Sequence, residues 1–100
     1  VYKRQGEHGR IIGGFLGMIH MHCLVVQVLF IEDEFRGQGM GHALMAKAEA
    51  LAKETDARWV TVETASFQAR PFYESLGYVV VCELEDIPEG GSIFILKKRL

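Results

Sequence analysis

Apolar residues follow two different spacings along the first half of this 100-residue chain. Residues 10–20 and 23–31 are rich in isoleucine, leucine, valine and phenylalanine, which is typical of β-strands. After a glycine-rich loop, apolar side chains recur at helical spacing as far as residues 55–56. They are Met40, Leu44, Met45, Ala48, Leu51 and Ala52. The pattern therefore predicts two strands followed by one helix.

The second half of the chain alternates between strand and helix signals. Residues 59–64 are β-branched at several positions and predict a strand. A short helix follows, with Pro71 in its first turn and Gly77 as its C-cap. Residues 78–84 and 92–98 flank a Pro/Gly turn and predict an antiparallel hairpin. The predicted order is β-β-α-β-α-β-β, an α/β fold with a mixed sheet.

Composition and charge exclude several classes of protein. Hydrophobic residues make up 49% and charged residues 24%, which fits a single globular domain. A net charge of −2 gives no basic face for a nucleic acid, and no apolar run reaches the roughly 20 residues that span a bilayer. Cys23 and Cys82 stand in apolar runs without metal-ligand spacing, so we expect no metal site and a reduced, cytoplasmic protein.

The first five residues, Val-Tyr-Lys-Arg-Gln, do not continue this pattern. They resemble the translation of a transposon end that is used to fragment DNA for sequencing. We expect residues 1–5 to be a sequencing-adaptor scar and residues 6–100 to be part of a longer domain. An ordinary edge strand is the alternative interpretation of residues 1–5.

The glycine-rich loop before the predicted helix carries the chemical signal. Gly37, Gly39 and Gly41 follow Arg36 on alternate positions. The start of a helix leaves backbone N–H groups unpaired and carries a partial positive charge, so it suits a phosphate group. Glycine lets the anion approach the backbone, and an arginine adds a charged donor. The loop therefore predicts a diphosphate-binding site.

The spacing of the glycines separates the ligand classes that use such loops. The P-loop pattern GxxxxGK[ST] is absent. The dinucleotide pattern GxGxxG fails because His42 and Leu44 occupy the position of its third glycine, counted from Gly37 and from Gly39. A nucleotide-binding α/β protein is the least favoured alternative. Close packing of the loop on the sheet is the purely structural one.

Two motifs together resemble a known family. Residues 29–52 are similar to the acyl-CoA-binding motif of the GCN5-related N-acetyltransferases, [RQ]xxGx[GA], with Arg36, Gly39 and Gly41 at its defined positions. Residues 69–78 resemble the second hallmark of that family, a short helix that ends in Tyr-x-x-Leu-Gly-Tyr. The two motifs stand in the expected order, separated by the expected strand.

The resemblance extends over roughly residues 10–100 and implies a fold. It implies the acyl-CoA N-acyltransferase fold with a mixed, mostly antiparallel sheet, here without the first strand and the two helices that wall the amine site in relatives. In the family, the strand before the glycine loop diverges from the next strand. The acyl-CoA arm lies in the resulting V.

The resemblance also implies acetyl-CoA as the co-substrate and assigns residues to it. The end of the strand would pair with the pantetheine amides, and the loop amides would bind the diphosphate. Ser66 stands where many relatives carry Asn, so its contact with the coenzyme is the least defined. The coenzyme-binding residues expected on this basis are Leu29, Phe30, Ile31, Arg36, Gly37, Gln38, Gly39, Met40, Gly41 and Ser66.

Two side chains are candidates for proton transfer. Tyr73 matches the tyrosine that in many relatives gives a proton to the departing sulfur, although a core aromatic residue is the alternative. Glu63 is our candidate for the base that accepts a proton from the amine. His20, His22 and deprotonation through water remain open alternatives for that base.

The predicted function is transfer of an acetyl group from acetyl-CoA to a primary amine, of a small molecule or of a protein, by direct attack. The alternative is a non-catalytic module that binds acyl-CoA. We expect no nucleic-acid or membrane partner. An exposed sheet edge would allow two chains to pair as a homodimer.

Overall fold

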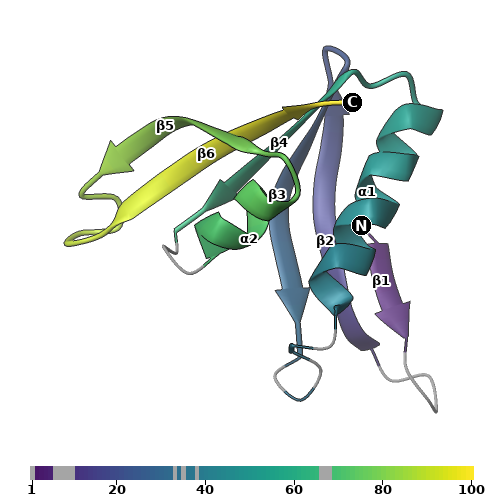
Figure 1. Ribbon diagram of the computed structural model, residues 1–100, viewed down its shortest axis with the longest axis horizontal. Coiled ribbons are helices and arrows are strands. Elements are labelled where there is room, and N and C mark those ends of the chain that lie inside the picture. Colours follow the sequence, from purple (N-terminus) through teal and green to yellow (C-terminus); the bar gives the residue numbers. More distant parts are fainter. Residues whose placement is uncertain (1, 6–10, 33, 35, 38, 66–68) are drawn as a thin grey trace.

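The computed structural model describes residues 2–5, 11–32, 34, 36–37, 39–65 and 69–100. Within these residues the chain forms six strands and two helices (Figure 1). They are β1 (Tyr2–Gln5), β2 (Ile11–His20), β3 (Cys23–Ile31), α1 (Met40–Glu54), β4 (Trp59–Thr64), α2 (Ala69–Ser75), β5 (Val79–Glu85) and β6 (Ser92–Arg99). From β2 onward, the order and type of the elements agree with the prediction.

Strand β1 is an element that the predicted order omitted. It pairs antiparallel with β2, with Tyr2 opposite Phe15, and the two rings stack with their centroids 5.3 Å apart. Four residues are too few to show a hydrophobic period, so this strand depends on a long-range ring contact that the local sequence does not reveal. Residues 2–5 thus take the edge-strand conformation. Their origin as an adaptor scar stays a prediction.

The sheet has the strand order β1-β2-β3-β4-β6-β5. All neighbouring strands pair antiparallel except β3 and β4, which are parallel. The sheet is therefore mixed and mostly antiparallel, as the sequence predicted. Its two edges are β1 and β5, and pairing of two chains along an edge stays a prediction.

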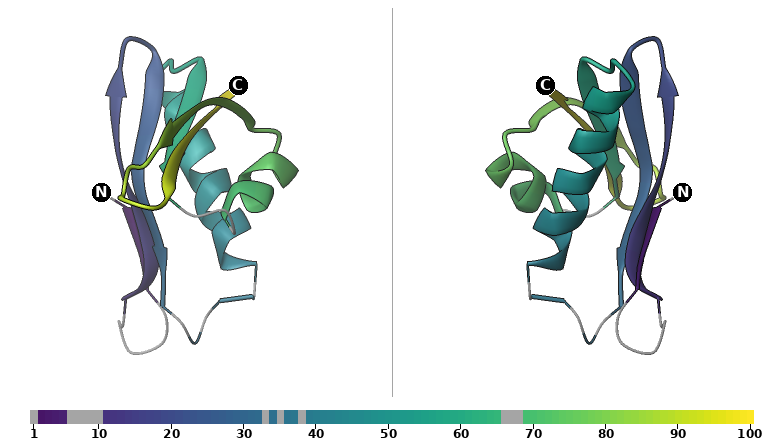
Figure 2. Two further views of the ribbon diagram at one scale, coloured as in Figure 1. Left: turned by 90° about the vertical axis from the view of Figure 1, so that its left-hand side faces the viewer. Right: turned by 90° about the vertical axis from the view of Figure 1, so that its right-hand side faces the viewer.

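Helices α1 and α2 lie on the same side of β2 and β3 (Figure 2). The helical stripe of apolar residues on α1 packs against the inward side chains of the sheet, because this contact removes both apolar surfaces from water. The buried residues of this core include Leu24, Val26, Leu44, Met45, Ala48, Ala52, Val60, Val62, Phe94 and Leu96. In the described part of the chain, neither helix is long and apolar enough to cross a membrane.

Candidate active site

A cavity of about 710 Å³ lies where the ends of β3 and β4, the start of α1 and the helix α2 come together. Its volume is in the range of small-molecule binding sites. It is lined by Gln27, Val28, Leu29, Phe30, Ile31, Arg36, Gly37, Gly39, Met40, Gly41, His42, Glu63, Thr64, Ala65, Ala69, Phe72 and Tyr73. The cavity thus joins the glycine loop to the second sequence motif.

Divergence of β3 from β4 opens one wall of this cavity. The two strands pair from Cys23 opposite Trp59 only as far as Val26 opposite Val62. Beyond that point β3 continues to Ile31, and Figure 1 shows the two strands diverging. The other edge of β3 remains paired with β2 throughout this stretch. Beyond Val26 the backbone N–H and C=O groups on the β4-facing edge are outside the β3–β4 ladder, an arrangement that suits pairing with an extended ligand.

The start of α1 provides a second wall, whose first N–H groups have no acceptor within the helix. Gly39 is the N-cap residue in the left-handed conformation, with φ 76°, and it makes no side-chain cap. The N–H of Ala43 donates to the carbonyl of Gly39 at 3.1 Å. The N–H groups of Met40, Gly41 and His42 precede this first helical bond and have no intrahelical acceptor. Because the first turn also holds no acidic side chain, the helix start favours an anion.

The glycines of the loop serve two different purposes. A Cβ at Gly37 or Gly39 would meet no atom within 4 Å, and both residues have positive φ, so this part of the loop is open toward the cavity. A Cβ at Gly41 would instead come within 3.0 Å of the Phe72 ring. Gly41 therefore lets α1 approach α2, a different contact from the close packing on the sheet that was the purely structural alternative. Arg36 donates from Nε to the carbonyl of Ile31 at 3.4 Å, beside the same cavity.

Tyr73 lines the cavity from α2 while its ring is almost completely buried. The ring makes edge-to-face contacts with Phe72 and Tyr78, with centroids 5.0 and 5.9 Å away. Burial raises the pKa of the Tyr73 hydroxyl above its ordinary value. Tyr73 is therefore a neutral phenol at physiological pH. A neutral phenol retains the proton that a general acid must give.

The structure separates the three candidate bases. Glu63 directly follows Val62, the last residue of β4 that pairs with β3, and its exposed side chain lines the cavity. His20 and His22 lie at the opposite end of β3, where the Nδ1 of His22 is 3.3 Å from the carbonyl oxygen of Asp56. Of these three side chains, only Glu63 is near the open strand edge.

Comparison with known proteins identifies the family. A profile of the acetyltransferase (GNAT) domain matches residues 5–100. The chain belongs to the GNAT acetyltransferase family. Blasticidin-S acetyltransferase from Streptomyces morookaense is 38% identical over 96 residues, which are 95% of this chain and 71% of that protein. An acetyltransferase from Agrobacterium fabrum is 30% identical over 95% of this chain and 69% of its own length. A crystal structure of an acetyltransferase from Bacillus cereus superimposes with a TM-score of 0.91 at 34% identity, and covers 98% of this chain and 70% of that one.

As a GNAT protein the chain is an acyl-CoA-dependent acetyltransferase with acetyl-CoA as its co-substrate. The bound coenzyme supplies the acetyl group as a thioester. The cavity residues fit such a molecule, because the open glycines at 37 and 39 and the first-turn amides of α1 suit its diphosphate. The unpaired edge of β3 suits the amides of its pantetheine arm.

The structure brings most of the residues expected from the sequence into one place. Every predicted coenzyme-binding and catalytic residue in the described part of the chain lines the cavity. Gln38 and Ser66 lie outside the described residues. Their roles, like those of the others, stay predictions.

Sequence reasoning assigned no role in the site to several residues of the cavity wall. His42 lies in the first turn of α1, and its ring contacts Phe72 edge-to-face at 5.1 Å. The sequence signal that could have indicated this role is the position of His42 directly after Gly41, the last glycine of the loop. Gln27 and Thr64 line the cavity because they lie beside the point where the strands part. No local motif marks that point.

Proposed function

We propose that this GNAT acetyltransferase moves an acetyl group from acetyl-CoA to the primary amine of a small molecule by direct attack. The observation that supports this most strongly is that one cavity collects four features. It joins an anion-favouring helix start, an unpaired strand edge, a neutral buried tyrosine and an exposed carboxylate. Each of these features answers one requirement of the reaction.

Each group has a defined task in this proposal. The amides of residues 36–41 and the Arg36 guanidinium hold the diphosphate, and the edge of β3 holds the pantetheine amides. Glu63 accepts a proton from the amine as its nitrogen forms a bond to the acetyl carbon. Tyr73 gives the proton of its hydroxyl to the sulfur as the carbon–sulfur bond breaks. The products are an N-acetylated amine and coenzyme A.

The positions of the two cysteines support direct attack. A two-step route through an acyl-enzyme needs a nucleophile in the cavity, and cysteine is the best suited. Within the described residues, neither Cys23 nor Cys82 lines the cavity. Initial-rate plots with both substrates varied should give intersecting lines. Parallel lines would indicate an acyl-enzyme and contradict this part of the proposal.

The likeness to a blasticidin-S acetyltransferase supports a small-molecule acceptor. Release of coenzyme A should be measured with blasticidin S, with other antibiotic amines and with a peptide that carries a free lysine and N-terminus. We expect turnover with at least one small amine and none with the peptide. Turnover with the peptide alone would refute the acceptor class and leave acetyl transfer intact.

Substituting Tyr73→Phe tests the central assignment. Removing the hydroxyl should lower kcat about a hundredfold, the usual lower range for a lost general acid. Calorimetric affinity for coenzyme A should stay unchanged, because the ring remains in place. Tyr2→Phe is the matched control, since Tyr2 lies against β2 outside the cavity lining. An unchanged kcat in Tyr73→Phe would remove the proton-donor role.

A further inference from the structure

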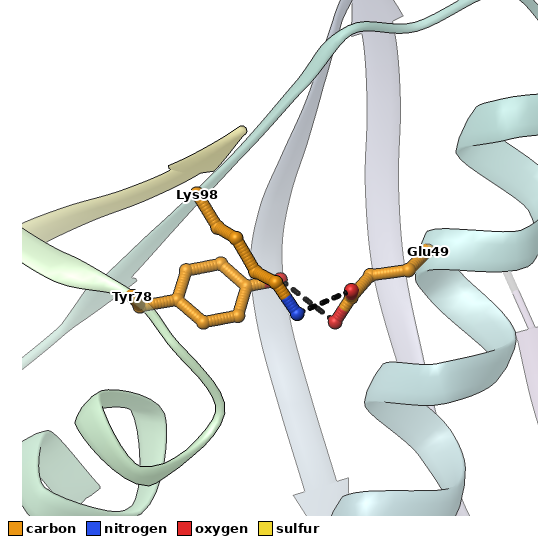
Figure 3. A network of polar contacts seen from close by, with 3 residues as sticks. All are labelled: Glu49, Tyr78 and Lys98. Carbon is orange, nitrogen blue, oxygen red and sulfur yellow. Dashed lines mark hydrogen bonds and ion pairs between the residues drawn. The ribbon is translucent and has the colours of Figure 1, made fainter. Parts of the chain in front are cut away.

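A polar network joins α1, β6 and the connection between α2 and β5, beside the wall that holds Tyr73. Figure 3 shows Glu49 of α1 with both carboxylate oxygens engaged. Tyr78 donates its hydroxyl to Oε2 at 3.3 Å, and Lys98 of β6 donates from Nζ to Oε1 at 2.8 Å. The Lys98 ammonium also lies 5.6 Å from the centroid of the Tyr78 ring. The three side chains thus hold one another in a closed arrangement.

The network reaches Tyr73 through Tyr78 by two routes. The Tyr78 ring lies edge-to-face against the Tyr73 ring, at 70° and 5.9 Å between centroids. The Tyr78 N–H also donates to the carbonyl of Tyr73 at 3.1 Å and so fixes the end of α2. Tyr78 is 2% exposed and Tyr73 is 5% exposed, so neither ring can shift without displacing its neighbours.

We propose that Glu49, Tyr78 and Lys98 act as positioning residues. They hold the Tyr73 hydroxyl at a fixed position relative to the start of α1. Glu49 lies on the helix whose first turn is the proposed anion site, and Tyr73 lines the same cavity from α2. The network is therefore a direct connection between the coenzyme-binding helix and the proton donor. The inference rests on the proposed role of Tyr73.

Burial distinguishes this network from an ordinary surface ion pair. The side chains of Glu49 and Lys98 are 17% and 29% exposed, whereas those of the Arg70–Glu74 pair on α2 are 38% and 45% exposed. Buried ion pairs contribute little net stability compared with apolar replacements, and in some proteins they specify one geometry. Tyr78 and Lys98 donate to different oxygens of Glu49, whereas a glutamine amide would put an NH₂ donor in place of one of them, so Glu49→Gln breaks one of the two hydrogen bonds in this geometry.

The first test is the kinetics of Glu49→Gln with the best amine of the acceptor panel. We expect kcat to fall about tenfold, since a small misplacement of a catalytic group has effects of this size or larger, with the KM for acetyl-CoA unchanged. In a Tyr73→Phe background the same substitution should have no further effect on kcat. A general loss of folding would lower kcat equally in both backgrounds.

Matched variants and a ligand-free readout complete the test. Glu54→Gln removes an exposed charge from the same helix and should leave kcat unchanged. Lys98→Arg keeps the charge and should retain most of the activity, whereas Lys98→Met should behave like Glu49→Gln. The ring resonances of Tyr73 in the free protein should shift in Glu49→Gln and stay in place in Glu54→Gln. Should Glu49→Gln unfold the chain, Tyr78→Phe breaks the same network with a smaller change in volume.

The possible failures are distinguishable. If Tyr73→Phe alone leaves kcat unchanged, both the proton-donor role and the positioning inference fall. If Tyr73→Phe lowers kcat but Glu49→Gln acts equally in both backgrounds, only the positioning inference is overturned. Unchanged Tyr73 resonances in Glu49→Gln would overturn it as well.

Discussion

Strand β4 has a different neighbour on each side, and the two sides differ in completeness. Toward β6 the pairing runs the whole length of β4, from Trp59 opposite Arg99 to Thr64 opposite Phe94. Toward β3 the pairing ends at Val26 opposite Val62. One strand therefore borders both a closed region of sheet and the open cavity.

Because of this difference, we expect stability to depend mainly on the β6 side of β4 and coenzyme binding to depend on the β3 side. On the β6 side, backbone groups are paired and side chains such as Phe94 and Leu96 are fully buried. On the β3 side, backbone groups face the cavity, and Val28 and Phe30 are 47% and 38% exposed. The fully paired side thus has the features of the more stable part of the sheet, because its backbone groups are paired and its side chains are buried.

The largest expected effect is a loss of stability caused by a substitution on the β6 side of β4. Phe94→Ala should lower the free energy of unfolding by about 4 kcal/mol, since it removes a fully buried ring and leaves a cavity. Phe30→Ala on the open side should cost about 1 kcal/mol, because its ring is partly exposed. Urea unfolding of both variants measures the difference. Equal losses would show that the open side carries as much stability as the closed one.

A smaller effect, on coenzyme A affinity, should follow from replacing a glycine beside the open cavity. Gly39→Val places a β-branched side chain at a φ of 76° and should weaken coenzyme A binding about tenfold, because the first-turn amides must rotate. Gly90→Val has a similar φ of 79° in open space within the β5–β6 turn. It should lose similar stability but keep its affinity. Calorimetry on both variants checks this, and equal affinities would argue against the loop as the anion site.

The smallest effect concerns the two buried tyrosines at alkaline pH. Burial raises the pKa of Tyr78, with further contributions from the Glu49 charge and its hydrogen bond, and burial also raises that of Tyr73. The unfolded chain loses these protons near the ordinary tyrosine pKa of about 10, while the folded chain keeps them. The stability that they contribute is complete below that pH and falls as pH rises above it.

In Tyr78→Phe, the free energy of unfolding should therefore fall less steeply above pH 10 than in the parent chain. The two slopes should differ by about 1 kcal/mol per pH unit. Urea unfolding at pH 9, 10 and 11 measures this slope. Tyr2→Phe is the control, because Tyr2 is only partly buried at the edge of the sheet. Identical slopes in the parent and in Tyr78→Phe would show that Tyr78 titrates alike in both states.

Much of the fold was predictable because its signals are local. The strands at 23–31 and 59–64 have the predicted bounds. Helix α1 ends at Glu54, next to the predicted end, where the Thr55 hydroxyl donates to the carbonyls of Leu51 and Ala52. Gly77 has the positive φ that its predicted C-cap position requires. The predicted order omitted β1, for which an edge strand was only the alternative interpretation, because its pairing with β2 and the Tyr2–Phe15 contact join residues far apart in the sequence.

The sequence by itself determined the elements, their order and the two motifs, because hydrophobic period, helix caps and glycine spacing are properties of neighbouring residues. Only the tertiary structure decided where β3 leaves β4, and that choice places Glu63 rather than His20 at the cavity. It also decided that Glu49 meets Lys98 across 49 positions of sequence. Such contacts depend on how strands diverge and helices pack, and no local pattern records them.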